Sequence, residues 1–452
     1  MSSSSPNGEL KPVIGTRSLM LNAVNQTIGT SIFVAPAIVS LQLDGASILG
    51  YIACAFMFML IVLCYIEVAS RVKGSGGSYA YVEEAFGPFA GFLTNAVFVI
   101  GWSTASDAAG LNLVADTLSV LFPVFSNPFF RAAFSILLLG ILTYINVRGA
   151  KQGVRLTNFT TITKLTPLLL LAILGWAFVS KENLRWEQMP TAKSLGDASL
   201  FLFFLFAGFE TSVNASSEIK NPKRTIPAAL LLSIGVVTIF YLLIQQVTLG
   251  VLGPRMQEFR NAPVAAVAEM MIGPAGSILI VCVTAFSLFS LLSGDVLVSP
   301  RMLYAGARSG LYPKFLGKVH PRFETPYWAV IVYTLLIFLF SISGGFKQLA
   351  ILSSGALLLI YFAVVLAMIK LRRRKQIDEE KTFKVPGGLI IPSLAVILIV
   401  WVFSHLKQNE ILSIAIFLAV MCVIYFVMKM KRQSIVNEEQ LVVESVTEKN
   451  DL

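Results

Sequence analysis

The sequence predicts an all-α integral membrane protein, and three observations lead to this prediction. The chain has 452 residues, of which 56% are hydrophobic and only 13% are charged, about half the charged share of an average soluble protein. Its mean hydropathy is +0.77. Apolar runs of about 20 residues, the length that crosses a hydrocarbon core of about 30 Å, recur along the chain. These features exclude a large soluble enzyme and place the chain in a lipid bilayer.

Twelve apolar runs are expected to cross the membrane, and their even number puts both termini on the same side. The third and eighth runs are long enough to tilt strongly or to carry an extra loop helix. The expected spans are 17–41, 46–70, 87–122, 130–147, 156–180, 196–218, 226–252, 264–300, 327–344, 349–370, 387–405 and 410–429.

The distribution of positive charge predicts that both termini are cytoplasmic. Lys and Arg in short loops resist translocation, and most of them fall in segments that this topology places inside, such as 301–322 and 370–384. The same distribution explains the net charge of +10 without a nucleic-acid partner. We therefore expect a multi-pass protein of the cell (inner) membrane with cytoplasmic tails at 1–16 and 430–452.

Two of the expected spans carry glycine and polar residues near their middle. Gly29 lies in the polar run 25–31 of the first span, and Gly208 lies beside Glu210 in the sixth. Freed N–H groups at such a break attract an anion and freed carbonyl groups attract a cation, which together suit a zwitterion. Close packing of small residues is the alternative interpretation, but it does not require Glu210 or the polar run.

The order of the two broken spans predicts an inverted repeat. They stand five spans apart, so the two halves of the chain have opposite orientations in the membrane. We expect the first repeat, helices 1–5, at 17–180 and the second, helices 6–10, at 196–370. Two additional helices follow at 387–429.

Lys164 is a basic residue inside the fifth expected span. A charge at the centre of the bilayer costs at least about 2.5–3.5 kcal/mol, so such a residue is a functional candidate. One interpretation is a side chain that extends back to the cytoplasmic headgroups. The favoured interpretation is an amine that faces the interior of the bundle and exchanges a proton, because burial disfavours its charged form.

Three carboxylates also lie within expected spans. Asp107 either lines a pocket for a polar or cationic group or is hydrated near the outer interface. Asp295 is expected to pair with Arg301 or with the lysine of the fifth span. Glu67 is expected to pair with Arg71 at the (i, i+4) spacing.

No enzymatic or metal-binding motif competes with a transport function. The chain has no H-E-x-x-H, G-x-S-x-G or Walker A sequence. His320 and His405 lie in loops on opposite sides of the predicted membrane, and the four cysteines lie in apolar runs without metal-ligand spacing. We therefore expect neither an enzyme nor a bound metal or cofactor.

Several motifs resemble the amino acid, polyamine and organocation (APC) transporter superfamily, which has the LeuT-type 5+5 inverted repeat. The resemblance covers nearly the whole chain. The family motif usually has a second glycine where Ser31 stands, and an Asp is common where Ser309 stands. The motifs that carry the resemblance are Ile28–Phe33, Arg71–Tyr81, Asn146–Gly149, Phe206–Glu210 with Glu218 and Thr225–Pro227, and Arg301–Pro326.

The resemblance implies a substrate site between the two broken helices. It places the substrate carboxylate on the first-span motif, the ammonium on carbonyl groups of the first and sixth spans, and Phe204 at an aromatic gate. Lys164 resembles the fifth-span lysine that takes the place of a sodium ion in the sodium-independent branch, and Glu210 is the next candidate for coupling. With the candidates of the third span, the predicted substrate-binding residues are Thr27, Ile28, Gly29, Thr30, Ser31, Phe204, Ala207, Gly208, Phe209, Glu210, Ser106 and Asp107.

The leading functional hypothesis is a sodium-independent amino acid transporter, either a proton symporter or an exchanger, that works by alternating access. Its expected partners are an amino acid substrate, protons and the lipid bilayer, with no nucleic acid. One alternative is a cationic amino acid or polyamine carrier with Asp107 and Glu210 as counter-charges. Another is a transporter-like amino acid sensor, which would need a longer soluble extension than the two short tails supply.

Overall fold

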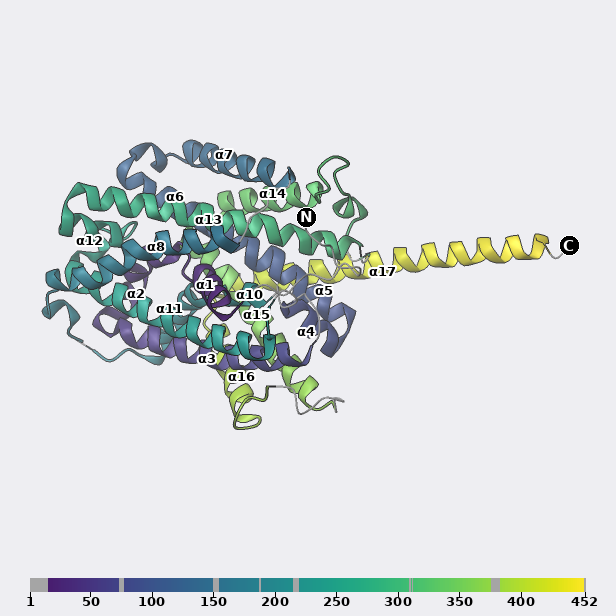
Figure 1. The fold of residues 1–452 in the computed structure, drawn as a ribbon, viewed down its shortest axis with the longest axis horizontal. Coiled ribbons are helices and arrows are strands. Elements are labelled where there is room, and N and C mark those ends of the chain that lie inside the picture. The colour runs from purple at the N-terminus through teal and green to yellow at the C-terminus, as the bar shows by residue number, and fades with distance from the viewer. Residues whose placement is uncertain are drawn as a thin grey trace.

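A computed structural model shows a nearly all-helical protein, as the sequence predicts. It describes residues 15–72, 77–148, 154–186, 188–213, 219–308, 310, 312–374 and 383–450, and no β-strand occurs among them. The helices form one bundle, from which the C-terminal part of the last helix projects (Figure 1). The predicted N-terminal tail up to residue 14, the glycine-rich loop at 73–76, Glu218 and Ser309 lie outside the described residues.

The first half of the chain forms eight α-helices and one π-helical segment. Their bounds are α1 Thr16–Thr27, α2 Ala35–Leu43, α3 Ser47–Arg71, α4 Gly77–Phe86, α5 Pro88–Ala96, η3 Val97–Thr104, α6 Ala105–Leu121, α7 Pro128–Val147 and α8 Val154–Leu174.

The second half contains the remaining described α-helices. Their bounds are α9 Ala192–Phe206, α10 Phe209–Val213, α11 Pro222–Leu252, α12 Pro263–Ile272, α13 Pro274–Arg308, α14 Tyr327–Ser343, α15 Phe346–Arg372, α16 Ile390–Phe403 and α17 Gln408–Asn450.

Nine helical segments of the described chain are long and apolar enough to cross a membrane. They include Pro88–Leu121 and Pro274–Arg308, which correspond to the two long runs of the sequence. Three apolar helices, α12, α14 and α16, are shorter. The protein is therefore a multi-pass membrane protein, while the number of twelve spans stays a prediction.

The structure adds detail at two predicted segments, and the first is the eighth run, which was expected to tilt strongly or to carry an extra helix. The expected span 264–300 is divided at Gly273, where the backbone takes a φ of +73° and Pro274 begins a new helix. Glycine adopts this conformation without a side-chain clash, and proline is favoured in the first turn of a helix. The segment 430–452, set apart as a tail, continues α17 as far as Asn450.

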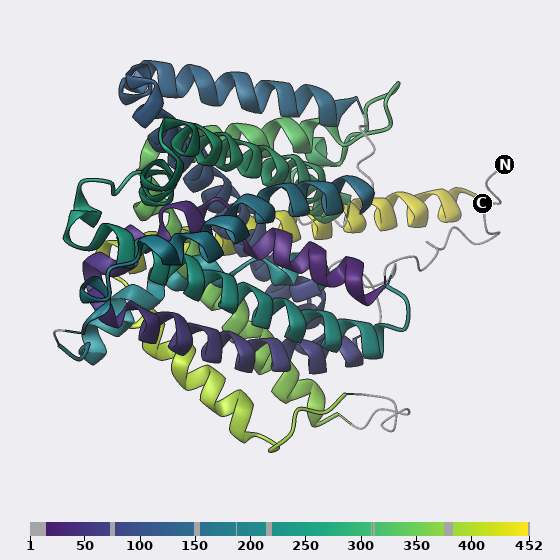
Figure 2. The same cartoon turned by 60° about the vertical axis from the view of Figure 1, so that its left-hand side comes forward.

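The helices with the central breaks lie inside the bundle and are surrounded by other elements. Helix α1 packs against α8, α10 and α11, and α10 also packs against α4. Figure 2 shows α1 in dark purple between the blue-teal α8 and the teal α11. Segments far apart in the sequence therefore meet around the two breaks.

Glu67 joins α3 to α15 near one end of the bundle. Its side chain is fully buried and accepts hydrogen bonds from Arg71 Nε at 3.2 Å and from Arg372 Nε at 2.7 Å. The backbone N–H of Val385, ahead of α16, donates to the second carboxylate oxygen at 2.8 Å. The predicted pairing with Arg71 is confirmed, and Arg372 is a partner that local spacing does not reveal.

Replacing Glu67 with Ala should destabilise the protein strongly, because two guanidinium groups would lose their buried counter-charge. Such a loss costs about 3–5 kcal/mol. The matched control is Glu84→Ala, since Glu84 pairs with Arg374 where both side chains are more than half exposed; exposed pairs contribute about 1 kcal/mol or less. Thermal unfolding in detergent should show a much lower midpoint for Glu67→Ala, and equal midpoints would contradict this role.

Candidate functional site

The first helix is interrupted within the polar run that contains Gly29. Helix α1 ends at Thr27, residues 28–30 are not helical, and a 3₁₀ turn begins at Ser31 before α2 starts at Ala35. The last carbonyl groups of one helix and the first N–H groups of the next have no partner within their own helix. The break therefore presents both acceptors and donors to its surroundings.

The second interruption lies at Ala207 and Gly208, between the end of α9 and the start of α10. Gly208 has a φ of +120°, and a Cβ atom there would lie 2.6 Å from the carbonyl oxygen of Gln26. Only glycine fits this position, because it combines a positive φ with close backbone contact. The two breaks thus touch each other directly.

Lys164 of α8 binds the end of α1. Its side chain is 1% exposed, and Nζ donates hydrogen bonds to the carbonyl oxygens of Asn25 at 2.7 Å and Ile28 at 2.6 Å. The lysine therefore faces the interior of the bundle, as the favoured interpretation predicts, and does not extend to the membrane surface. Its ammonium neutralises the partial negative charge at this helix end.

Two other side chains bind groups that the breaks set free. The hydroxyl of Tyr241 lies 2.8 Å from the carbonyl oxygen of Thr27 and 2.6 Å from that of Leu205, so it can donate its single hydrogen to either break. The carboxylate of Glu210 accepts from the Gly208 N–H at 3.0 Å and from the Tyr361 hydroxyl at 3.0 Å. Glu210 therefore caps the second break.

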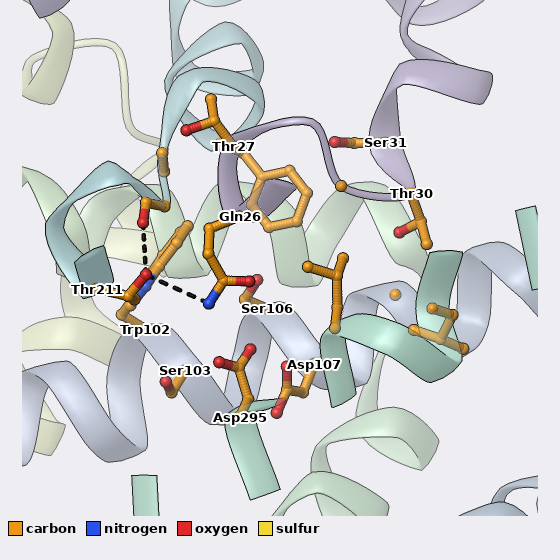
Figure 3. Close-up of a pocket in the computed structure, with 17 residues that line it drawn as sticks. Gln26, Thr27, Thr30, Ser31, Trp102, Ser103, Ser106, Asp107, Thr211 and Asp295 are labelled. Atoms are coloured by element: carbon orange, nitrogen blue, oxygen red, sulfur yellow. Dashed lines mark hydrogen bonds between the residues drawn. The ribbon is translucent and has the colours of Figure 1, made fainter. Parts of the chain in front are cut away.

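A pocket lies between the two breaks and the segment that leads into α6 (Figure 3). Gln26 Nε2 donates to the hydroxyl of Thr211 at 3.3 Å, which links the two breaks along one wall. The lining residues are Gln26, Thr27, Gly29, Thr30, Ser31, Trp102, Ser103, Ser106, Asp107, Gly110, Phe204, Ala207, Gly208, Thr211, Leu288, Leu291 and Asp295.

Most of the predicted substrate residues line this pocket, and three do not. Ile28 offers its carbonyl oxygen to Lys164, and Glu210 caps the second break. Phe209 packs its ring against Tyr65 at 5.3 Å. The residues that do line the pocket are Thr27, Gly29, Thr30, Ser31, Ser106, Asp107, Phe204, Ala207 and Gly208.

A π-helical segment adds pocket residues that the sequence pattern did not predict. Trp102 and Ser103 lie in η3, where the wider turn redirects side chains relative to a regular α-helix. The Trp102 ring lies 5.9 Å from that of Phe204 in an edge-to-face arrangement. The polar stretch from Trp102 to Asp107 indicates a binding region in the sequence. The 3.6-residue period of a regular α-helix does not predict which of its side chains face the pocket, because the segment is π-helical.

The predicted pairing of Asp295 with Arg301 or Lys164 is wrong. Asp295 instead lies beside Asp107, and both carboxyl groups line the pocket (Figure 3). Arg301 donates to the carbonyl oxygen of Leu297, and Lys164 is bound to the end of α1. Asp107 itself is 5% exposed and accepts from the Tyr333 hydroxyl at 2.8 Å, so it is a pocket residue and not a hydrated interfacial one.

Comparison with known proteins identifies the family. The profile described as amino acid permease matches residues 14–437. The chain belongs to this family. The permease is 27% identical to the branched-chain amino acid permease BcaP of Bacillus subtilis, over 94% of this chain and 95% of that protein. It is 26% identical to the methylthioribose transporter of the same organism, over 97% of each. It is 28% identical to the human large neutral amino acids transporter small subunit 2, over 87% of this chain and 75% of that protein.

Replacing Gly208 with Ala should abolish ligand binding by the permease, because the added methyl group would force the two breaks apart. The matched control is Gly235→Ala in α11, where a Cβ atom meets nothing within 4 Å. Binding of radiolabelled amino acids to the purified variants measures the effect, with size-exclusion chromatography as the test of folding. Wild-type affinity in Gly208→Ala would show that the close contact between the breaks is not required.

Proposed function

We propose that this permease is a sodium-independent amino acid transporter that works by alternating access. The observation that carries the proposal is the contact of the Lys164 ammonium with the carbonyl oxygens of Asn25 and Ile28. Carbonyl groups at a helix end attract a cation. Here a cation of the protein itself occupies that position, so no sodium ion is needed to stabilise the break.

The proposed substrate lies between the two breaks. Its carboxylate binds the backbone N–H groups of Thr30 and Ser31, where a helical segment begins and donors lack intrahelical partners. The N–H of Gly29 donates to the carbonyl oxygen of Thr27 at 2.9 Å, so Gly29 lines the site without supplying a free donor.

The ammonium of the proposed substrate binds the carbonyl group of Ala207, at the end of α9. The carbonyl oxygen of Gly208 already accepts from the hydroxyl of Thr211 at 2.7 Å and from the N–H of the same residue at 3.2 Å. Phe204 lines the same pocket and acts as the gate. The names of BcaP and of the large neutral amino acids transporter support an amino acid as the substrate.

The proposed arrangement in the membrane is the one expected from the sequence. Twelve spans form two inverted repeats at 17–180 and 196–370, followed by two helices at 387–429. Both termini are cytoplasmic and the bilayer is the cell membrane. The excess of Lys and Arg in the inner segments supports this topology.

Coupling to protons is proposed to involve Lys164. The charged amine holds the end of α1 through two charge-assisted hydrogen bonds, which contribute about 1.5–3 kcal/mol each. The neutral amine loses these contributions, and a change of this size shifts a two-state equilibrium by roughly tenfold or more. Glu210 is the second candidate, because its carboxylate holds the other break through Gly208.

Uptake should proceed equally well in sodium and in choline buffers at constant pH, because Lys164 already supplies the cation at the end of α1. Proteoliposomes loaded with a panel of radiolabelled amino acids provide the measurement, with protein-free liposomes as the blank. A collapse of uptake in choline would refute sodium independence.

Lys164→Ala should still bind substrate but lose the dependence of uptake on a pH gradient. Lys164→Arg should lose it as well, because a guanidinium group does not deprotonate at any working pH. The control is Lys347→Ala, since Lys347 is exposed at the start of α15. Uptake driven by a proton gradient is compared among the three variants, and normal proton-driven accumulation by Lys164→Ala would transfer the coupling role to Glu210.

A further inference from the structure

The acidic pair, Asp107 of α6 and Asp295 of α13, is a feature that the proposed transport cycle does not use. The two carboxyl groups lie side by side in the wall of the pocket (Figure 3). In Figure 3 they point into the pocket from the side opposite to Thr27 and Ser31. They therefore face the region where the side chain of a substrate held at the breaks would extend.

The surroundings of the acidic pair contain no counter-charge among the residues that line the pocket, since none of these is Lys, Arg or His. The Tyr333 hydroxyl of α14 donates to Asp107, and Glu210 of α10 is a further acidic group that acts on Asp295. Lys164 of α8 is turned to the end of α1.

Two contacting carboxylates in a buried site cannot both remain ionised. We therefore expect Asp107 and Asp295 to share one proton before a ligand binds. A cationic group that enters the pocket can take the place of this proton, because its donors can bind both carboxylates at once and it restores the same net charge of minus one. The proton then leaves to the solvent, and no other bond is formed or broken.

We propose that the acidic pair binds the cationic side chain of a basic amino acid, which displaces the shared proton. A guanidinium group suits the pair best, since its planar array of donors can serve two carboxylates together. This inference rests on the proposed function, because it assumes an amino acid held between the two breaks. It revises the cationic-carrier alternative, in which Glu210 was a counter-charge, by assigning that role to Asp295.

Arginine and citrulline form the decisive ligand pair, because they share nearly the same shape and differ in the charge of the side chain. We expect the wild-type permease to bind arginine at least about tenfold more tightly than citrulline, as hydrogen bonds to a charged group are stronger. Isothermal titration calorimetry on purified protein at neutral pH gives both affinities. Leucine is the third ligand and reports amino acid binding that does not depend on the acidic pair.

Variants test whether the acidic pair causes this preference. Each single variant, Asp107→Asn or Asp295→Asn, should lose the proton release on arginine binding, because a lone carboxylate needs no shared proton. The double variant Asp107→Asn/Asp295→Asn should bind arginine and citrulline with an affinity ratio of about one. The matched control is Asp116→Asn, because Asp116 lies on the same helix as Asp107 but pairs with Arg131 outside the pocket. This control should retain the wild-type ratio. The comparison of arginine with citrulline in the wild-type protein does not depend on whether any variant folds.

Proton release provides an independent measurement. Titrations in two buffers of different ionisation enthalpy should show release of about one proton per arginine bound and almost none per citrulline. Arginine affinity should fall as the pH is lowered, since the shared proton then competes with the ligand.

Binding of leucine and citrulline together with an arginine-to-citrulline ratio near one in the wild type would overturn the inference and leave the proposed function standing. A high ratio that persists in the double Asn variant would overturn it as well. Absence of binding by all three ligands would refute the proposed amino acid site and the inference with it.

Discussion

The structure depends on one constraint, which is that backbone polar groups freed inside a bilayer must find partners within the protein. Breaking two helices in the bundle frees such groups at two places. Lys164 donates to the end of α1, Tyr241 lies between Thr27 and Leu205, and Glu210 binds the N–H of Gly208. The remaining donors and acceptors are left for a ligand in the pocket. The proposed specificity for a zwitterion thus follows from the backbone donors and acceptors that have no partner within the protein at each break.

The same constraint makes the two breaks a single unit. Gly208 allows the second break to touch the backbone of Gln26, and the side chain of Gln26 reaches Thr211. A movement of α1 must therefore be accompanied by a movement of α10 or must break these contacts. Ligand that binds both breaks would strengthen this connection, which is the differential interaction that any conformational shift requires.

The sequence predicts which helices form this site better than it predicts which of their side chains face the pocket and what those side chains contact. Gly29 and Gly208 stand out because helix-breaking residues in the middle of apolar runs point to a binding site, and the pairing of Glu67 with Arg71 follows from local spacing. The partners Arg372 and Asp295 are far away in sequence, so only the packing of whole helices reveals them. The assignment of Asp295 failed because the span was expected to end next to Arg301, whereas α13 continues to Arg308. The π-helical turn around Trp102 changes the direction of side chains without a change in composition.

The charges inside the bundle suggest why a proton and a cationic ligand can replace each other. When Lys164 and Glu210 are both ionised their charges cancel, and the proposed shared proton leaves the acidic pair with one negative charge. An amino acid with a neutral side chain leaves that sum unchanged. A basic amino acid adds one positive charge while the released proton removes one, so the sum is again the same. Because uncompensated charge is costly in a medium of low dielectric constant, an exchange that conserves the buried charge allows one pocket to release or retain its ligand without a large electrostatic barrier.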